Sequence, residues 1–169
     1  MSQPIHVELK KRQPFESLEQ AAVINLMRTN DRLMNRIGRL FREFGITASQ
    51  YNVLRILRGE GQPLPCLEIA DRMIQVVPAM TGLLDRLEKQ GLIVRKRCTE
   101  DRRVIFVDLT ENALLLLARL DQPVLDMHKS LVGHLTPDEL TELSRLLEKA
   151  RAKVTDDSAP TAERTEAAD

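Results

Sequence analysis

Two adjacent arginines preceded by an acid stand at the start of a run of β-branched residues, in TEDRRVIFVDL at positions 99–109. A guanidinium group is permanently charged and carries five N–H donors, so Arg102 and Arg103 can bind DNA phosphates or enter a narrow A·T minor groove. Asp101 cannot bind DNA, and we expect it to hold a neighbouring guanidinium, from Arg103 or Arg86, in one rotamer. The pattern predicts the tip of a DNA-gripping β-wing, and a merely solvated charged turn is the alternative.

The segment before this hairpin predicts a helix, at 77–90, that could lie against DNA bases. Its apolar stripe at helical spacing consists of Met80, Leu83, Leu84 and Leu87. Short side chains on the other faces let a helix backbone approach closely in a major groove about 12 Å wide. Thr81 could bond a phosphate or base edge, Ala79 could touch a thymine methyl, and Gln75 could bind adenine. The candidate DNA-binding residues here are therefore Gln75, Pro78, Ala79, Thr81, Gly82 and Arg86.

The charges are unevenly spread, although 25 basic and 25 acidic residues give a net charge of zero. Residues 86–103 carry seven Lys or Arg against three acids, whereas residues 155–169 carry one Arg against five acids. One short segment thus forms a local basic patch of the kind that binds nucleic acid. Arg95 and Arg97 lie on one face of the predicted strand, and which face that is stays open.

Helix boundaries are marked by capping residues, glycines and prolines. Thr47 with Gln50, and Thr136 with Glu139, form capping boxes that open helices. Thr110 can cap a further helix. We expect helices to end at Gly45, near Gly59 and at Gly91. Pro65 is expected at the first position of a short helix, and Pro123 should kink or interrupt a later one.

The order of predicted elements is a long helix, a helix, a short helix, a helix, a hairpin and two helices. The expected fold class is mainly α with a small β-hairpin wing, a winged helix-turn-helix with N- and C-terminal dimerisation helices. We expect a flexible arm at 1–15, dimerisation helices at 16–44 and 110–153, a DNA-binding lobe at 45–109 and a disordered acidic tail at 154–169. The long first helix is either a bundle helix or one shared with a second subunit.

The segment LLDRLEKQGLIVRKRCTEDRRVIFVDLT, positions 83–110, resembles the MarR family of bacterial transcriptional regulators. Its helix, glycine, strand and wing end in the family's D-x-R element, here Asp101-Arg102-Arg103, and the likeness extends over about 16–153. The resemblance implies a homodimer that binds palindromic double-stranded DNA, with Arg103 in the minor groove and Arg86 at the end of the recognition helix. It also implies a small lipophilic or phenolic effector, bound between the dimerisation helices and the DNA-binding lobe.

Two positions depart from the family pattern. Many relatives have Arg or another polar residue where this chain has Gly82, so position 82 offers no side-chain contact to a base. Val77 is a poor helix cap where relatives often have Ser or Thr. The wing retains the family pattern.

Aromatic residues, cysteines and histidines are further candidates for binding or catalysis. Phe41, Phe44 and Tyr51 lie near the expected effector cleft, and packing residues are the alternative. Cys66 and Cys98 are too few for a disulfide framework and fit a reducing compartment, with redox or metal sensing as a further hypothesis. His6, His128 and His134 show no metal-ligand spacing. We expect no metal, no cofactor and no enzyme, because no phosphate loop, catalytic triad or carboxylate pair emerges.

No window reaches the roughly 18 apolar residues that a membrane span requires, and the N-terminus lacks the apolar core of a signal peptide. We therefore expect a cytoplasmic protein without membrane contact. The sequence favours a ligand-responsive transcriptional regulator, more often a repressor than an activator. The alternatives are a winged-helix protein–protein interaction module without specific DNA binding and a nonspecific architectural DNA binder.

Overall fold

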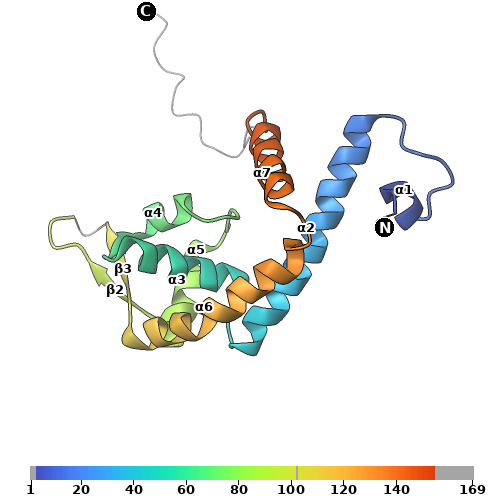
Figure 1. Cartoon of the computed structure of the whole chain (residues 1–169). Coiled ribbons are helices and arrows are strands. Elements are labelled where there is room, and N and C mark those ends of the chain that lie inside the picture. Colours follow the sequence, from blue (N-terminus) through green and yellow to red (C-terminus); the bar gives the residue numbers. More distant parts are fainter. Residues whose placement is uncertain (1–2, 102, 155–169) are drawn as a thin grey trace, which may run out of the picture. The chain divides into compact units, whose positions relative to one another are not determined.

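The computed structural model describes residues 3–101 and 103–154, and it is mainly helical with one small sheet (Figure 1). The chain divides into two compact units, Met1–Met127 and His128–Asp169. The elements in chain order are α1 (Ile5–Glu8), α2 (Leu18–Glu43), α3 (Ala48–Glu60), β1 (Leu64–Pro65), α4 (Cys66–Asp71), α5 (Met80–Lys89), β2 (Ile93–Arg97), β3 (Ile105–Leu109), α6 (Glu111–Val132) and α7 (Pro137–Arg151). This order confirms the predicted fold class.

The long helix α2 has a defined start and end. The Ser17 hydroxyl accepts the backbone N–H of Gln20 at 3.1 Å, which satisfies one of the donors left free at a helix N-terminus. The helix ends at Glu43, and Gly45 adopts the left-handed conformation with φ of 75°. Glycine pays no steric penalty there, so the chain can turn sharply into α3.

Helix α3 opens with the predicted capping box. The Thr47 hydroxyl accepts the N–H of Gln50 at 3.2 Å, and the Gln50 side chain accepts the N–H of Thr47 at 2.8 Å. The helix continues to Glu60, and Gly61, with φ of 72°, is the left-handed residue that follows. The helix therefore ends one residue after the predicted stop near Gly59, because Gly59 still has a helical backbone.

Helices α4 and α5 form a helix-turn-helix pair, and both begin later than predicted. Pro65 precedes α4 as its cap residue and also belongs to β1. Pro78 and Ala79 lie in a turn, and Met80 is the first residue of α5. Ala79 has φ of −120° and ψ of 58°, which is outside the helical region, so Pro78 cannot be the first helical residue.

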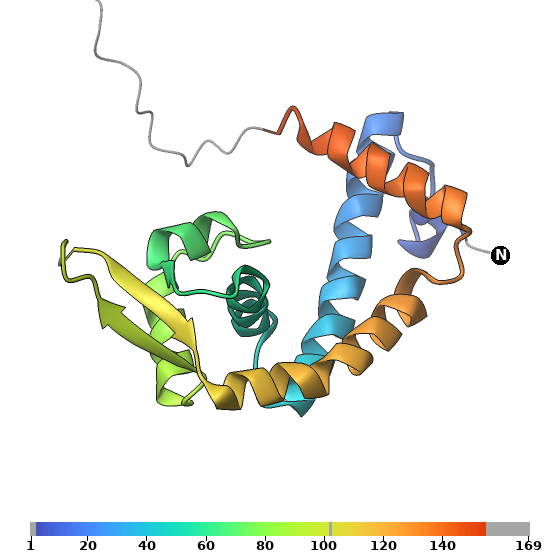
Figure 2. The same cartoon turned by 60° about the vertical axis from the view of Figure 1, so that its left-hand side comes forward.

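The sheet has three antiparallel strands in the order β1-β3-β2. The predicted hairpin is confirmed, with pairs running from Ile93 opposite Leu109 to Arg97 opposite Ile105 (Figure 2). Strand β1 was not predicted, and it pairs Leu64 with Val107 on the other side of β3. The base of the wing is therefore anchored to the segment that leads into α4.

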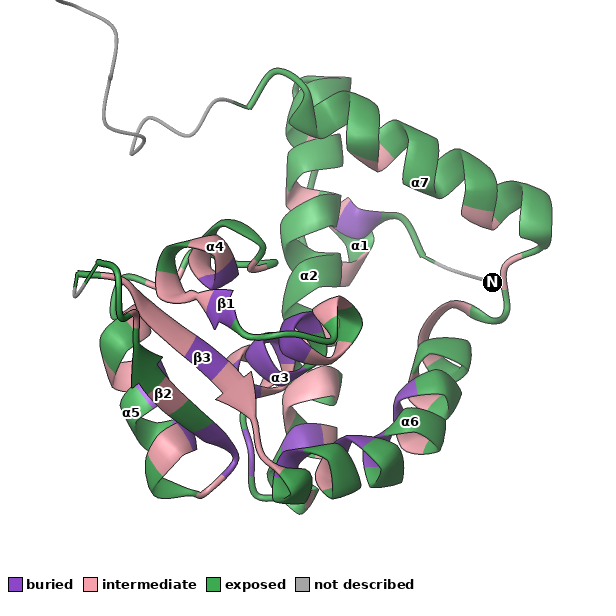
Figure 3. Cartoon of the chain, turned by 90° about the vertical axis from the view of Figure 1, so that its left-hand side faces the viewer, coloured by how far each residue is buried: buried purple, intermediate pink, exposed green. Residues whose placement is uncertain are grey.

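The core of the first unit fastens α5 and the sheet to the surrounding helices (Figure 3). Burying an aliphatic side chain of this size stabilises the fold by about 1.5–3 kcal/mol, so this cluster fixes where α5 lies. Its largest fully buried side chains come from α3, α4, α5, β2, β3 and α6: Val53, Leu54, Ile69, Leu84, Leu87, Ile93, Val107, Leu117 and Leu120.

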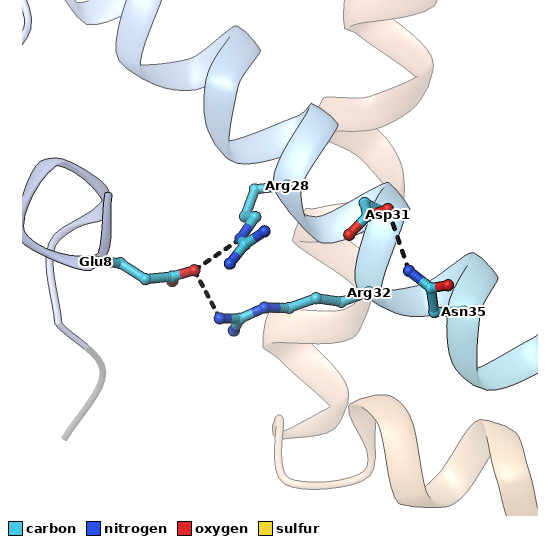
Figure 4. Close-up of polar contacts among 5 residues, drawn as sticks. All are labelled: Glu8, Arg28, Asp31, Arg32 and Asn35. Atoms are coloured by element: carbon cyan, nitrogen blue, oxygen red, sulfur yellow. Dashed lines mark hydrogen bonds and ion pairs between the residues drawn. The ribbon is translucent and has the colours of Figure 1, made fainter. Parts of the chain in front are cut away.

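Within the segment 1–15, for which we predicted a flexible arm, the structure has the short helix α1. Ile5 is buried, and the Glu8 carboxylate binds Nε of Arg28 at 2.9 Å and Nη2 of Arg32 at 2.6 Å (Figure 4). These contacts hold α1 against α2. The arginines lie 20 and 24 positions further along the chain, so a local pattern could not indicate them.

Helix α6 is continuous through Pro123, where we predicted a kink or an interruption. Leu120 and Val124, on either side of the proline, are buried, and this packing holds the helix together where a backbone donor is missing. In the second unit, Thr136 and Glu139 form the predicted capping box of α7, which has no buried residue. The predicted tail at 154–169 lies, apart from the exposed Val154, outside the described residues.

Candidate nucleic-acid interface

Helix α5 has one buried face and two chemically different exposed flanks. Leu83, Leu84 and Leu87 are buried in the core. Because 3.6 residues make a turn, Gly82, Arg86 and Lys89 share one stripe at i, i+4 and i+7, on which Arg86 and Lys89 are exposed. Asp85 and Glu88 lie on the flank next to β2. The buried face matches the stripe predicted from sequence, and the exposed faces are free to meet a ligand.

Arg95 of β2 binds both acids on the flank of α5. Its Nη2 lies 2.7 Å from the Asp85 carboxylate, and its Nε lies 2.9 Å from the Glu88 carboxylate. These contacts lower the pKa of Glu88 and raise the pKa of Arg95, in both cases mainly through the hydrogen bond between the two side chains. The sequence left open on which face of the strand Arg95 lies, and the structure places its side chain toward α5. Its charge holds the wing against the helix and is not available to DNA.

The wing tip is organised through its backbone. The Asp101 carboxylate accepts the backbone N–H of Arg103 at 2.9 Å, and the Asp101 carbonyl accepts the N–H of Val104 at 3.0 Å. The Arg103 side chain is exposed, as a DNA-binding arginine must be. Arg102, also predicted to bind DNA, lies outside the described residues.

The expected role of Asp101 needs correction. Among the residues that the structure describes, Asp101 forms no ion pair with the guanidinium of Arg103 or Arg86. Arg86 instead donates its Nε–H to the backbone carbonyl of Gly82 at 3.0 Å. An aspartate carboxylate that accepts the backbone N–H two residues later forms an Asx turn. At Asp101 this hydrogen bond takes the place of the predicted ion pair.

The turn before α5 presents different side chains from those expected. The Gln75 amide lies 3.8 Å from the sulfur of Met34 in α2, so its side chain is turned toward that helix. Ile74 and Val76, on either side of it, are 79% and 74% exposed. The sequence did not indicate that these two apolar residues are exposed, because an exposed valine or isoleucine gives the same sequence pattern as a buried one.

Thr81 and Gly82 lie on the first turn of α5, where Thr81 is exposed and Gly82 is half-buried. A methyl group added at Gly82 would find no atom within 4 Å, so the surface there is open. Ala79 is exposed and its carbonyl accepts the N–H of Leu83 at 3.1 Å. The structure therefore brings Ala79, Thr81 and Gly82 together at the N-terminal end of the recognition helix, places Arg86 in its last turn and sets Gln75 apart from them.

The three aromatic residues considered for an effector cleft contact other parts of the first unit. The Phe41 ring is 3% exposed and stacks on Tyr51 with ring centroids 4.3 Å apart. Burial raises the pKa of the Tyr51 hydroxyl. Phe44 lies beneath the Arg119 guanidinium at 5.8 Å. These contacts favour the packing alternative.

The two cysteines are free and half-buried. Burial raises the pKa of the Cys66 thiol, which disfavours the reactive thiolate. No group of three or more His, Cys, Asp or Glu residues suited to a metal ion occurs within the described ranges. In that same part of the chain, no helix has the length and apolar character to cross a membrane.

A helix-turn-helix followed by a β-hairpin, with an exposed arginine at the hairpin tip and an open stripe on the second helix, defines a winged helix-turn-helix protein. The second helix of such a motif is the one that enters the major groove of DNA. The observed fold and site therefore place the chain in this class of DNA-binding proteins.

Comparisons with known proteins agree with this class. The model of the MarR family matches residues 46–105. The crystal structure of a MarR transcription factor from Planctomyces limnophilus is 44% identical and has a TM-score of 0.63, with 80% of this chain and 99% of that chain covered. The crystal structure of a mutant MarR from Escherichia coli complexed with operator DNA is 27% identical with a TM-score of 0.68, covering 79% and 94%. The homoprotocatechuate degradative operon repressor of Escherichia coli is 24% identical over 132 residues, covering 78% and 88%.

The chain belongs to the MarR family of transcriptional regulators. This membership confirms the resemblance drawn from positions 83–110. It favours a DNA-binding regulator over a winged-helix module that only binds other proteins.

Proposed function

We propose that this protein is a homodimeric, sequence-specific DNA-binding regulator that represses transcription and is released from its operator by a small-molecule effector. The observation that carries this proposal is the open basic stripe of α5 beside a wing tip whose arginine is held outward by its own backbone. The relative from Escherichia coli that was crystallised with operator DNA supports a DNA ligand. The operon repressor of the same organism supports repression.

The proposed complex follows from the shape of duplex DNA. Helix α5 lies in a major groove, where Thr81 bonds a base edge or phosphate and Ala79 contacts a thymine methyl. Exposed Val76, just before the helix, adds a second apolar contact of the same kind. Arg103 enters the flanking minor groove, whose negative potential is strongest in A·T tracts. Readout thus depends on small and apolar groups more than on hydrogen bonds.

The dimer follows from an uncovered apolar surface on α2. Val23, Leu26 and Met27 lie at i, i+3 and i+4 and are 55%, 43% and 67% exposed. A second copy of the helix would cover them. A twofold dimer places its two recognition helices about 34–36 Å apart, one turn of the duplex, and so matches a palindromic operator. Such a regulator acts in the cytoplasm, beside the chromosome.

Effector release needs a ligand that prefers a second arrangement of the dimer. A ligand weakens DNA binding only by the ratio of its affinities for the DNA-competent and DNA-incompetent states. We propose a small lipophilic or phenolic compound as this ligand. Isothermal titration with and without operator DNA would measure that ratio.

The test of the proposal is the loss of the Arg103 side chain. The operator is first selected by the protein from a random-sequence DNA pool, and its affinity is then followed by fluorescence anisotropy over a salt series. Arg103→Ala should weaken binding and flatten the salt dependence, because each phosphate contact releases about 0.9 counterions. Arg36→Ala, an exposed arginine on α2, is the matched control and should change neither quantity.

Two results would contradict the proposal. One is failure of the pool to converge on any sequence, which would support a nonspecific binder or a protein-binding module. The other is an Arg103→Ala variant with unaltered affinity and salt slope, which would remove the wing from DNA binding.

A further inference from the structure

A cavity of about 700 Å³ opens beside the C-terminal half of α5, where α2 ends and α3 begins. Three cationic side chains line it: Arg42 from the last turn of α2, and Arg86 and Lys89 from α5. They come from two elements far apart in the chain, so the fold alone brings them together. The polar residues between them are Thr47, Gln50 and Gln90.

The walls of this cavity are fixed by hydrogen bonds. Gln50 is 5% exposed, and its side-chain amide donates to the Gln90 side chain at 2.8 Å. The Gln90 amide in turn donates to the carbonyl of Gly45 at 3.3 Å. The corner between α2 and α3 is therefore tied to the end of α5. These hydrogen bonds position the backbone around Arg42, Arg86 and Lys89 before any ligand binds.

None of the three cations forms an ion pair with a carboxylate within residues 3–101 and 103–154. The neighbouring acids Asp85 and Glu88 are on the other flank of α5, where Arg95 binds both. Cations that share a cavity without counter-charges repel one another, and an anion bound among them relieves this repulsion. The site is therefore suited to an anionic group.

The stripe on α5 indicates which anion this is. Arg86 and Lys89 continue the line that starts at Gly82, where the surface is open and no side chain obstructs approach. A ligand in the cavity therefore meets the same stripe that the proposed function places in the major groove. The sugar-phosphate backbone borders that groove, and it carries one negative charge per nucleotide on a regular path along the helix flank.

We propose that the cleft formed by Arg42, Arg86 and Lys89 seats a backbone phosphate of the operator, which makes Arg42 and Lys89 DNA-binding residues in addition to the wing. This inference rests on the proposed function, because it assumes that α5 enters the major groove. The contact fixes the register of α5 on the duplex and carries no sequence information of its own. It also joins the dimerisation helix α2 directly to the DNA.

The first experiment compares Arg42→Gln and Lys89→Gln with the control Arg36→Gln, an exposed arginine on α2 outside the cavity. Operator affinity is measured by fluorescence anisotropy over a salt series, with thermal unfolding by circular dichroism to confirm the fold. The two cleft variants should bind more weakly, and each should lower the salt slope by about one counterion. The control should match the unaltered protein.

The second experiment identifies the phosphate. Single operator phosphates are replaced by uncharged methylphosphonates and tested with each protein. One position should weaken binding of the unaltered protein more than binding of Arg42→Gln or Lys89→Gln, since each variant has already lost one of the three cations around that phosphate. Losses that add fully at every position would overturn the inference, as would cleft variants with unchanged affinity and slope.

A third arm distinguishes a free anion from DNA. Inorganic phosphate is added at constant ionic strength. If it binds the cleft of the operator complex as tightly as the cleft of the free protein, DNA leaves this site empty, the cleft is a small-anion site and the inference is wrong. Failure of the unaltered protein to bind any selected duplex would instead overturn the proposed function itself, so the two failures give different results.

Discussion

At the wing tip, the Asp101 carboxylate bonds the backbone N–H of Arg103 and leaves the guanidinium of that arginine free. The position therefore requires an acceptor oxygen and does not require a negative charge. Orientation of Arg103 comes from fixing its backbone, because a fixed Cα limits where the exposed side chain can reach. An ion pair between the two side chains would have reduced the positive charge available to DNA.

This geometry predicts different outcomes for two substitutions of Asp101. Asp101→Asn retains an acceptor oxygen and should leave operator affinity within about twofold. Asp101→Ala removes the hydrogen bond, whose net contribution of about 0.5–1.5 kcal/mol corresponds to roughly two- to tenfold weaker binding. Anisotropy titrations of both variants at one salt concentration provide the measurement. Equal weakening of the two variants would show that the charge matters and would restore the ion-pair hypothesis.

At the scale of elements, one arginine connects the wing to the recognition helix. Arg95 of β2 contacts Asp85 and Glu88, which lie one turn apart on α5. The contact fixes the distance between the helix and the hairpin, and so the spacing between the major-groove and minor-groove contacts. It also offsets one of the two negative charges on that flank of α5.

The connection should depend on pH in a defined direction. The folded-state pKa of Glu88 is lowered by Arg95. Its stabilising effect is therefore present above the ordinary glutamate value of 4.5 and is lost as pH falls through the lower folded value. The unaltered protein should have a higher Tm than Glu88→Gln near pH 7, and the difference should shrink below pH 4.5. Melting curves by circular dichroism between pH 3 and 7 would show this, and a difference independent of pH would contradict it.

Local signals predicted most of the elements, since they act over a few residues. The capping boxes at Thr47 and Thr136 and the left-handed Gly45 and Gly91 were all found in the structure. Strand β1 and helix α1 were not predictable in this way. Leu64 pairs with Val107 and Glu8 binds Arg28, and such contacts between distant segments leave no periodic pattern in either one.

The sequence indicated which residues of the candidate site are available to bind DNA, but it did not indicate which side chains contact one another. The exposed Arg103 and the open Gly82 stand where the sequence placed them. The sequence could not assign Arg95 to the acids of α5, because alternation in a strand gives a face but not its neighbour. Arg42 was missed because its cavity forms only when the end of α2 meets α5.

At the scale of the whole molecule, the proposed recognition of an operator depends on two copies of the lobe. One recognition helix and one wing contact a few base pairs, which gives limited specificity. When two lobes are held at a fixed spacing, binding of the second half-site becomes intramolecular. The affinity for a palindrome therefore exceeds the affinity of either lobe for its half-site. The apolar residues exposed on α2 are the part of the first unit that such a dimer would cover, with further exposed leucines on α6, among them Leu114 and Leu115.

Replacing Met27 by glutamate should therefore separate the subunits and weaken operator binding together. Met27 is 67% exposed in the single chain, so the charge costs little in the monomer, but in a dimer it would be buried against apolar surface without a partner. Sedimentation velocity should give the unaltered protein twice the 19.2 kDa chain mass and Met27→Glu close to the single mass. Thr29→Glu, a like charge on the opposite side of the same helix, should remain dimeric. A Met27→Glu protein that stays dimeric would place the interface elsewhere, and a monomer with full operator affinity would show that one lobe is sufficient for recognition.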